Sequence, residues 1–369
     1  MLYTIKILLN QPTRLILTVI GISLCMILML FLFGIYKGVA DGSVEYIREN
    51  KVDLWILQRN STNILRGTSI LSAYQKERIE QNQNVLEASP VLLLLTTVKN
   101  SDKRSTIFLA GYDHKTGLGG PPKIIKGRNI SADNEIVLDN SFALNNRFDV
   151  GDKLIILDDT LIVTGLSSGT NAFVIQYAFT TLAEAQSLLG FPGIVTCYLV
   201  KLKNGSDVNK TADELQSLIN GTVVYHHSEF LANNIKEMES GFLPILYAVA
   251  SLGAIVLTTV LSLILSINIL ERKKDFAVMK ILGAPSGFLP KLIIQQAVFI
   301  SLTSGLLCVL LYFPLVSVIE QLSPEVSTVT TVYQIIIVLI AGLLMGVLSS
   351  AIALSRLRKI YPLEVFYDR

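Results

Sequence analysis

The stretch LILTVIGISLCMILMLFLFGIY, residues 15–36, contains no charged side chain over 22 consecutive positions. A helix needs about 20 apolar residues to cross the hydrocarbon core of a bilayer, which is about 30 Å thick. Three further stretches without Asp, Glu, Lys or Arg follow, at residues 242–270, 292–319 and 326–355. A buried helix in a soluble core would explain one such stretch at most. Together they predict four transmembrane helices, because a helix satisfies its own backbone hydrogen bonds inside the bilayer.

The composition of the 369-residue chain agrees with this prediction. Only 16% of its residues are charged and 51% are hydrophobic, whereas a soluble domain carries about 25% charged residues. The hydrophobic content excludes a disordered chain, and a net charge of +2 is too small to indicate a nucleic-acid-binding protein. We expect the first stretch to be a retained helix rather than a signal peptide, because it is too long and no small-residue cleavage site follows it.

The charged residues outside these stretches predict the orientation of the chain. Eleven Lys and Arg residues lie before the first stretch, at 271–291 and after the fourth stretch, while the third and fourth stretches are linked by a loop with only Glu320 and Glu325. Basic residues near helix ends favour the cytoplasmic side. Both termini and the 271–291 loop are therefore expected in the cytoplasm. Residues 37–241, with 20 basic and 23 acidic side chains, are expected outside.

The external segment has the pattern of a mixed α/β domain. Runs of β-branched and aromatic residues predict strands at 53–58, 91–98, 105–110, 135–138, 173–180 and 195–202, with a hairpin formed by 153–157 and 161–164. Apolar residues at helical spacing predict helices at 73–81, 141–146, 182–188, 208–219 and 228–240. Ser206, beside the acidic Asp207, is a candidate N-cap of the fourth of these helices. The last helix runs towards the second apolar stretch and is a candidate stalk.

The predicted fold is therefore an α-helical membrane protein with four transmembrane helices and a mixed α/β extracytoplasmic domain inserted between helices 1 and 2. The expected segments are an N-terminal segment with the first helix (1–37), the external domain (38–240), the second helix (241–270), a cytoplasmic coupling helix (271–290), the third helix (291–319), the fourth helix (326–355) and a cytoplasmic tail (356–369). Spaced small residues mark candidate helix contacts at Gly342 with Gly346 and at Ser262 with Ser266, with chance as the alternative.

The sequence carries no motif for catalysis or nucleotide binding. No P-loop of the form G-x-x-x-x-G-K-[ST] occurs, and neither do H-E-x-x-H, C-x-x-C or G-x-S-x-G. The adjacent His226 and His227 would point to opposite faces of a strand, so solvated or domain-interface residues are expected there rather than a metal site. The apolar stretches lack the acidic and basic residues through which ion-coupled transport proceeds. A non-catalytic membrane subunit without a bound metal is expected.

The most informative segment is ILERKKDFAVMKILGA, residues 269–284. At helical spacing Phe276, Met279 and Leu282 share an apolar side, and the lysines lie elsewhere. Gly283 is a natural helix C-cap. Two interpretations follow, namely a basic helix lying on anionic lipid or a lever that docks into a groove on a cytoplasmic partner.

This segment resembles the coupling helix of the MacB/FtsX-like ABC transporter permeases, whose pattern is roughly E-R-x-x-E-[IF]-A-[VL]-[LM]-[KR]-x-L-G-A. Asp275 replaces the usual Glu and keeps its charge. The matching residues are Glu271, Arg272, Phe276, Ala277, Val278, Met279, Lys280, Leu282, Gly283 and Ala284. Three other segments also resemble the family. NQPTRLILTVIGIS at 10–23 is similar to the entry into its first helix, and YPLEVF at 361–366 is similar to its C-terminal tail. VGDK at 150–153, with VTG at 163–165, is similar to part of its external domain.

The resemblance implies a homodimeric permease in a bacterial inner (plasma) membrane, bound to two copies of a separate cytoplasmic ABC ATPase. ATP binding would close the ATPase pair, move the coupling helices and pass the movement to the external domains. ATP and Mg²⁺ would belong to the ATPase, and this chain would bind no cofactor. Membrane lipid and a periplasmic adaptor are further expected partners. The residues assigned to ATPase coupling are Glu271, Arg272, Lys273, Lys274, Asp275, Phe276, Ala277, Met279, Lys280, Leu282, Gly283 and Ala284, with 2–13 and 362–366 as secondary candidates.

The substrate is suggested by a narrower resemblance. The short form with a compact external domain is similar to the DevC/HrtB-like branch of the family, which implies export of haem or a glycolipid. Cys25, Met26, Met29 and Tyr36 lie along the predicted outer half of the first helix, and Cys25 and Met29 share a face. Sulfur ligands can bind haem iron, so these four are candidate substrate-binding residues. Ordinary packing of methionine in a helix is the alternative.

Three functions remain open at this point. The chain could export or extract a lipophilic molecule, or it could act as an FtsX-like mechanotransmitter that regulates an envelope enzyme without moving a substrate. It could also be a structural membrane protein without an ATPase. Capture of an ATPase subunit separates the third function from the first two, and transport in proteoliposomes separates the first from the second.

Overall fold

A computed structural model describes residues 8, 12–64, 67–100, 103–157, 159–171, 175–271, 278–279, 285, 287–323 and 328–357. The chain forms two compact units. The membrane unit contains residues 1–37, 243–319 and 328–369, and the sheet unit contains 38–242 together with 320–327. Each unit is described by itself below.

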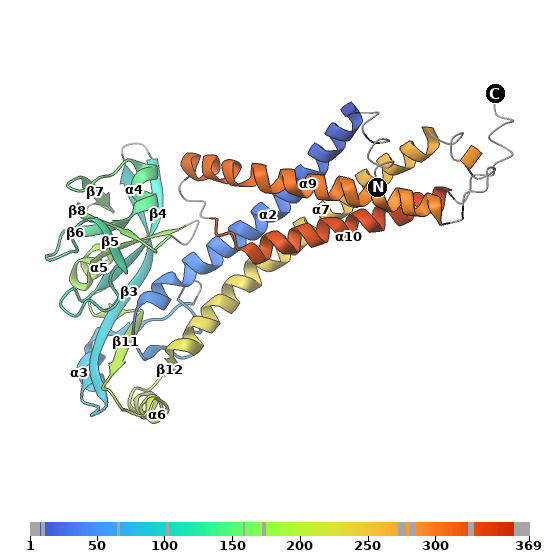
Figure 1. Ribbon diagram of the computed structural model, residues 1–369. Coiled ribbons are helices and arrows are strands. Elements are labelled where there is room, and N and C mark those ends of the chain that lie inside the picture. Colours follow the sequence, from blue (N-terminus) through green and yellow to red (C-terminus); the bar gives the residue numbers. More distant parts are fainter. Residues whose placement is uncertain are drawn as a thin grey trace. The chain divides into compact units, whose positions relative to one another are not determined.

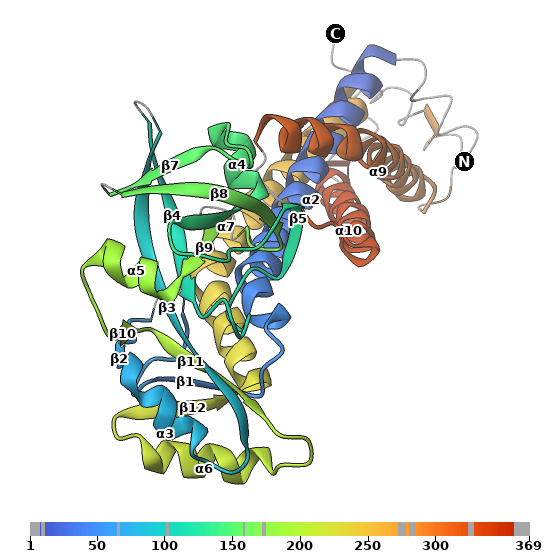
Figure 2. The ribbon, with the colours of Figure 1, turned by 90° about the vertical axis from the view of Figure 1, so that its left-hand side faces the viewer.

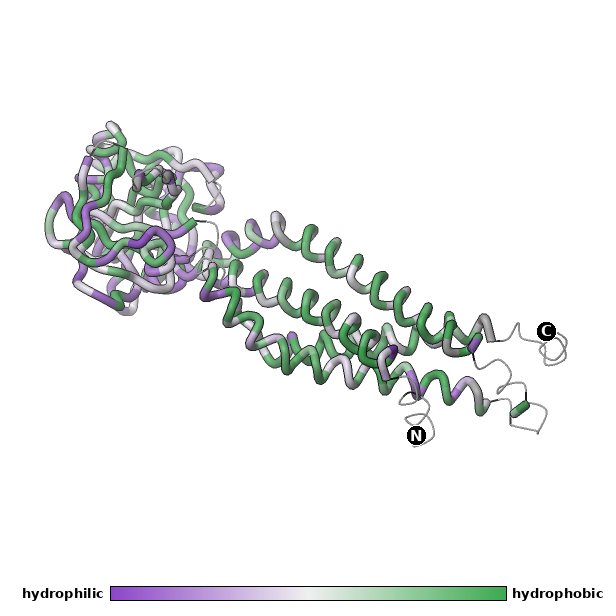
Figure 3. Tube along the Cα trace, turned by 90° about the horizontal axis from the view of Figure 1, so that it is seen from above, coloured by the Kyte–Doolittle hydropathy of each residue, from purple (hydrophilic) through white to green (hydrophobic). Residues whose placement is uncertain are grey.

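The membrane unit is built from four long helices (Figure 1). Their bounds are α2 Pro12–Glu49, α7 His227–Glu271, α9 Phe288–Leu322 and α10 Val332–Leu357. Each helix is long and apolar enough to cross a membrane, and Figure 3 shows hydrophobic residues along most of their length within this unit. The four predicted spans therefore correspond to four helices. The predicted small-residue pair Ser262 and Ser266 is buried, which supports a packing role.

Two of these helices extend more than ten residues beyond the apolar stretches that predicted them. α2 continues to Glu49 because apolar residues at helical spacing, such as Val44 and Ile47, are fully buried beyond the charge-free stretch. α7 begins at His227, so the predicted stalk and the second span form a single helix of 45 residues. Pro244 lies inside α7, where a proline removes one backbone hydrogen bond. The helix continues on both sides of it.

The sheet unit contains a ten-stranded mixed sheet (Figure 2). The strand order is β12-β1-β11-β3-β4-β9-β6-β8-β5, and β7 pairs with both β3 and β8. The strands are β1 Leu54–Gln58, β3 Val85–Asn100, β4 Lys103–Tyr112, β5 Lys123–Gly127, β6 Glu135–Asp139, β7 Lys153–Ile156, β8 Asp159–Ser168, β9 Gln176–Thr181, β11 Cys197–Leu202 and β12 Thr222–His226. A separate small sheet pairs β2 Leu71–Ser72 with β10 Ile194–Val195.

The central strand of this sheet is β3, which differs from its prediction. Its 16 residues begin at Val85 rather than at position 91, because β11 supplies backbone partners for its first part. From Val91 onward β3 pairs with β4, and near its end it also pairs with β7. The strand expected at 173–180 is described only from position 175, and β9 begins at Gln176.

The helices of the sheet unit follow the predicted pattern with one correction. They are η1 Ala73–Gln75, α3 Lys76–Glu80, α4 Asn140–Asn146, α5 Leu182–Leu189 and α6 Val208–Leu218. Ser206 is not the N-cap of α6, and the prediction was wrong. Asp207 immediately precedes the helix and its side chain accepts a hydrogen bond from Lys210 N at 3.2 Å, the usual reach of a capping carboxylate. The Ser206 hydroxyl donates to Asn84 O at 3.4 Å instead.

The two faces of β1 belong to different apolar cores, because successive side chains of a strand alternate. Trp55 packs in a core that includes Tyr46 from α2 and Phe230 from α7. Ile56 packs in a core that includes Leu215 from α6. The end of α2 and the start of α7 therefore cover one face of this part of the sheet, with α6 on the other. A strand covered on both faces is apolar at consecutive positions.

A tryptophan–histidine contact joins β1 to the first turn of α7. Trp55 Nε1 donates to His227 Nδ1 at 3.2 Å. Burial lowers the pKa of His227, against the opposing effect of the Asp53 carboxylate. Only the unprotonated Nδ1 can accept this hydrogen bond. His227 is therefore neither fully solvated nor at an interface between the two units, but has a specific partner within the sheet unit.

This contact predicts a pH-dependent signal from Trp55, which is the only tryptophan of the chain. Since the folded-state pKa of His227 is lowered, the unfolded chain binds this proton more readily, and the stabilisation is lost as the pH falls below about 6.5. We expect Trp55 emission to change with a midpoint below that value. His227→Gln should remove the transition, whereas His114→Gln should keep it. A midpoint above 6.5, or an unchanged curve in His227→Gln, would contradict the assignment.

Candidate coupling site

An ion pair joins two helices in the described part of the coupling region. Arg14 Nη1 lies 2.7 Å from Glu271 Oε2, and the two side chains are 28% and 46% exposed. Arg14 is in the first turn of α2 and Glu271 is the last residue of α7. A basic residue at a helix N-terminus and an acidic residue at a C-terminus are each disfavoured by the helix dipole. Their pairing offsets both effects and joins the two helices where the predicted coupling segment begins.

Two of the twelve residues assigned to ATPase coupling, Glu271 and Met279, are described. Met279 is half-buried and packs against the apolar core of the membrane unit, whereas the neighbouring Val278 is 44% exposed. Leu8, within the predicted N-terminal candidate segment, is buried in the same core as Met279. Val278 therefore offers apolar surface to a partner, whereas Met279 does not.

The other assigned residues lie outside the described part of the chain. They are Arg272, Lys273, Lys274, Asp275, Phe276, Ala277, Lys280, Leu282, Gly283 and Ala284. The C-terminal candidate segment at 362–366 also lies outside it, as do most residues of the N-terminal segment at 2–13. Their assignment to ATPase coupling stays a prediction.

The ion pair predicts a measurable but small coupling between α2 and α7. Because both side chains are partly exposed, Arg14→Glu alone should lower the free energy of unfolding by at most about 1 kcal/mol. The exchanged pair, Arg14→Glu with Glu271→Arg, should recover this loss, since it restores opposite charges and suits both helix dipoles. A double-mutant cycle on the full chain measures the interaction. A coupling energy of zero would show that the ion pair does not join α2 and α7 energetically.

The other end of the membrane part of α2 is held by a second set of contacts. Gly34 O accepts a hydrogen bond from Val329 N at 3.1 Å, and the Tyr312 and Thr330 hydroxyls lie 2.6 Å apart. A Cβ at Gly34 would lie 2.7 Å from the Tyr312 hydroxyl oxygen, so only glycine fits without a shift. Sequence reasoning missed these contacts, because the partners are almost 300 positions from Gly34 and share no motif with it.

Glycines on α10 bring this helix close to its neighbours. A Cβ at Gly342 would lie 2.7 Å from Met26 Cε on α2, and one at Gly346 would lie 2.2 Å from Ser301 Oγ on α9. Real Cβ contacts are not this short, so a larger residue at either position requires a shift, which the flexible end of Met26 allows more readily than the short side chain of Ser301. The predicted small-residue pair is therefore a packing face of α10, as expected for small residues in membrane helices.

The four candidate substrate-binding residues have different surroundings. Met26 and Met29 are 1% and 7% exposed, and Cys25 and Tyr36 are half-buried. Met26 packs against α10, as described above, whereas Met29 lies beside Gly253 on α7, where a Cβ would be 3.6 Å from its Cγ. The two thioethers thus face different helices. This geometry is that of helix packing, and their role as haem ligands stays a prediction.

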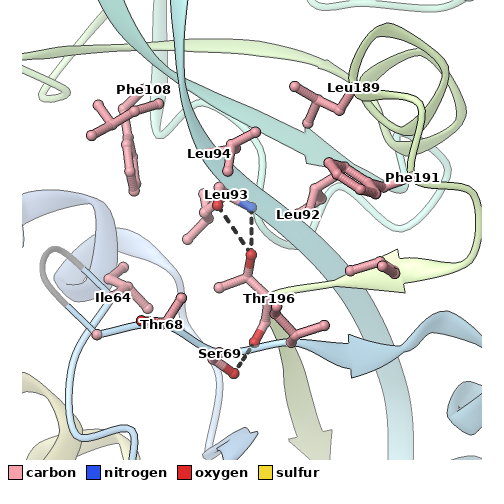
Figure 4. Close-up of a pocket in the computed structure, with 14 residues that line it drawn as sticks. Ile64, Thr68, Ser69, Leu92, Leu93, Leu94, Phe108, Leu189, Phe191 and Thr196 are labelled. Carbon is pink, nitrogen blue, oxygen red and sulfur yellow. Dashed lines mark hydrogen bonds between the residues drawn. The ribbon is translucent and has the colours of Figure 1, made fainter.

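A cavity in the sheet unit was also missed by sequence reasoning (Figure 4). Its volume is about 330 Å³, and Leu92 to Leu95 of β3 form one wall. The sequence feature that could have indicated the cavity is the run of four leucines at 92–95. Successive side chains of a strand point to opposite faces, so this run places apolar side chains on both faces of β3. Among the described residues, no group of three His, Cys, Asp or Glu side chains could hold a metal ion.

Two protein families match different parts of the chain. The MacB-like periplasmic core domain matches residues 15–218, which is more than half of the chain. The FtsX-like permease C-terminal domain matches residues 242–362 and so includes the membrane part of α7, the coupling segment, α9 and α10. Most of the sheet unit, from residue 38 to residue 218, therefore lies within the first match.

Several proteins are similar to this chain. An uncharacterized ABC transporter permease of Mycobacterium tuberculosis is 22% identical over 96% of both chains. Another from Methanocaldococcus jannaschii is 24% identical over 48% of this chain, which spans about half (47%) of that relative's length. The periplasmic region of MacB from Actinobacillus actinomycetemcomitans covers 49% of this chain and 92% of that structure, with 14% identity and a TM-score of 0.41. The chain belongs to the MacB/FtsX-like family of ABC transporter permeases.

Proposed function

We propose that the chain is the membrane subunit of a dimeric ABC transporter. In this proposal a separate cytoplasmic ATPase hydrolyses ATP, and the permease uses the resulting movement to export or extract a lipophilic or amphipathic molecule. Both termini and the coupling segment face the cytoplasm, and the sheet unit is the external domain. The distribution of basic residues supports this orientation.

The observation that carries the proposal is the continuity of α7. This single helix runs from His227 to Glu271, and its last residue opens the predicted coupling segment and pairs with Arg14. A helix resists compression along its axis because each turn is hydrogen-bonded to the next. Movement imposed on the coupling segment would therefore be passed along α7 and, through the ion pair, to α2.

The test starts from the full chain in native membranes. We expect an ATPase subunit with Walker motifs to copurify with the chain, and its ATP hydrolysis to increase when the two are reconstituted in proteoliposomes. ATP-dependent movement of a fluorescent amphiphile would support export. ATPase binding and stimulation without such movement would favour the FtsX-like mechanotransmitter, and no ATPase binding would contradict both functions.

Haem is one candidate substrate of this transporter. The candidate ligands are Met26 and Met29, with Cys25 and Tyr36 on the same helix. A haem titration of the full chain should shift the Soret band if a thioether binds the iron. No shift in the wild type, or the same shift in a Met26→Leu, Met29→Leu double variant, would remove this hypothesis. A glycolipid would then be the remaining candidate of the two.

A further inference from the structure

The cavity of the sheet unit lies where the sheet is locally interrupted (Figure 4). Pairing between β11 and β3 ends at Cys197 and Val91. The next residue back along the chain, Thr196, donates its backbone N–H to Val91 O at 2.8 Å. Its hydroxyl then accepts from Leu93 N at 2.9 Å and donates to Leu93 O at 3.1 Å. The Thr196 hydroxyl thus takes the place of the backbone groups that a continued β11 would offer to Leu93. Between this point and Val98, where β7 pairs with β3, no strand of the described chain pairs with this edge of β3, and the space forms the cavity.

Several polar groups of the cavity wall have hydrogen-bond partners within the protein. The Ser69 hydroxyl donates to Thr196 O at 2.5 Å and accepts from Gln58 N at 2.9 Å. Thr68 O accepts a hydrogen bond from the Ser61 hydroxyl at 2.5 Å. A polar ligand would have to lose its water without gaining these groups as partners, which is unfavourable. An apolar ligand leaves the existing hydrogen bonds intact.

The remaining described residues of the wall are mainly apolar. Leu92, Leu93, Phe108, Leu189 and Ile194 line the cavity, and its described lining includes no charged residue. The volume of about 330 Å³ falls at the lower end of the range for ligand pockets. It is about twice that of an apolar cavity known to bind benzene. The space therefore suits a slender apolar group larger than a single ring.

Exposed apolar side chains surround the cavity. Ile70, Leu94, Leu95 and Phe191 line it and are 56%, 36%, 49% and 55% exposed. Apolar surface in water is unfavourable by roughly 25 cal/mol per Å², and a contiguous exposed patch commonly marks a binding site. An occupant of the cavity would cover part of this surface.

We propose that this cavity binds the hydrocarbon chain of an amphipathic molecule and leaves the polar headgroup in water outside the apolar rim. The inference narrows the substrate class of the proposed transporter and, in that respect, rests on the proposed function. Binding itself requires neither the ATPase nor ATP. The chain could come from a free single-chain amphiphile or from a lipid of the membrane, and both sources present the same chemistry to the cavity.

The test uses the full chain in lipid nanodiscs and photoreactive hydrocarbon probes. In one arm a fatty acid with a diazirine on its chain is added, and in the other a phospholipid carries the same chain within the nanodisc. After irradiation, mass spectrometry maps the labelled peptides. We expect labelling of peptides that contain Ile70, Leu92 to Leu95 and Phe191, and competition by the unlabelled fatty acid. Labelling in only one arm identifies the source of the chain and supports the proposal.

Matched variants separate the cavity from exposed apolar surface in general. Ile70→Asp introduces a charge at the cavity and should reduce its labelling by about tenfold or more. Leu86→Asp introduces the same charge at a residue of the same unit that is equally exposed, 57% against 56%, and does not line the cavity. It should leave the labelling unchanged. Unaltered Trp55 emission in both variants verifies that the fold is intact.

Two results would overturn the inference. One is the absence of probe on the cavity peptides of the wild type, and the other is equal labelling in Ile70→Asp and Leu86→Asp. If the wild-type cavity is not labelled but the chain stimulates the ATPase normally, the inference of hydrocarbon-chain binding is wrong and the proposed transporter function stands. Normal cavity labelling without any ATPase partner would remove the proposed transporter and leave the binding site.

Discussion

Replacing Gly346 by leucine is expected to prevent α10 from packing against α9. A Cβ at this position would lie 2.2 Å from Ser301 Oγ and 3.5 Å from Ala297 O. Serine has a short side chain that can yield only by rotation, and the remaining atoms of leucine would then meet the backbone of α9. Overpacking typically destabilises by about 1 to 3 kcal/mol, and we expect the upper end of this range because several atoms are inserted. Thermal unfolding and monodispersity of the purified full chain measure the effect.

The matched control is Gly21→Leu on α2. No atom lies within 4 Å of a Cβ built at Gly21, and the gain in helix propensity, about 0.8 kcal/mol, is similar at both positions. We expect Gly21→Leu to stay close to the wild type. The double variant Gly346→Ala, Ser301→Gly should have a higher unfolding temperature than Gly346→Ala alone, because the Ser301 side chain that the new Cβ would meet is removed. Equal unfolding temperatures for Gly346→Leu and Gly21→Leu would refute this packing account.

The architecture of the membrane unit could be predicted from the sequence because bilayer crossing depends on composition over about 20 residues. The four charge-free stretches became α2, α7, α9 and α10. The true ends of α2 and α7 could not be predicted in the same way. Residues 38–49 include charged positions, so the criterion of zero charge ended the helix too early. Burial of Val44 and Ile47 in the sheet unit extends it, and such burial depends on elements distant in the sequence.

The candidate site was predictable only where it followed a local pattern. The coupling segment, which includes Glu271, could be identified from its amphipathic spacing and its family resemblance. Its partner Arg14 is 257 positions away, and nothing in the local sequence of either residue indicates the pair. The cavity beside β3 depends on the side chain of Thr196 replacing a strand residue. In the sequence, a threonine whose hydroxyl replaces a backbone partner looks the same as any other threonine in a strand.

Val278→Asp is expected to abolish stimulation of the partner ATPase by this chain. We expect the coupling segment to dock into a groove of the ATPase, and Val278 is an exposed apolar residue of that segment. A carboxylate buried in an apolar interface typically weakens binding by about 2 kcal/mol or more, which is about 30-fold. ATP hydrolysis by the reconstituted complex measures the effect. Ala277→Arg, at a position outside the described residues, should act in the same way.

Controls must separate docking from folding, and the surroundings of the two neighbouring residues allow this. Val278→Thr keeps the shape of the side chain without a charge and should retain most of the stimulation. Val278→Asp should unfold at the wild-type temperature, since its side chain is not part of the apolar core. Met279→Asp should lower both stimulation and stability, because Met279 packs against that core. Full stimulation by Val278→Asp would show that the ATPase docks elsewhere, and the ion pair between Arg14 and Glu271 would then join two helices without serving the coupling of ATP hydrolysis.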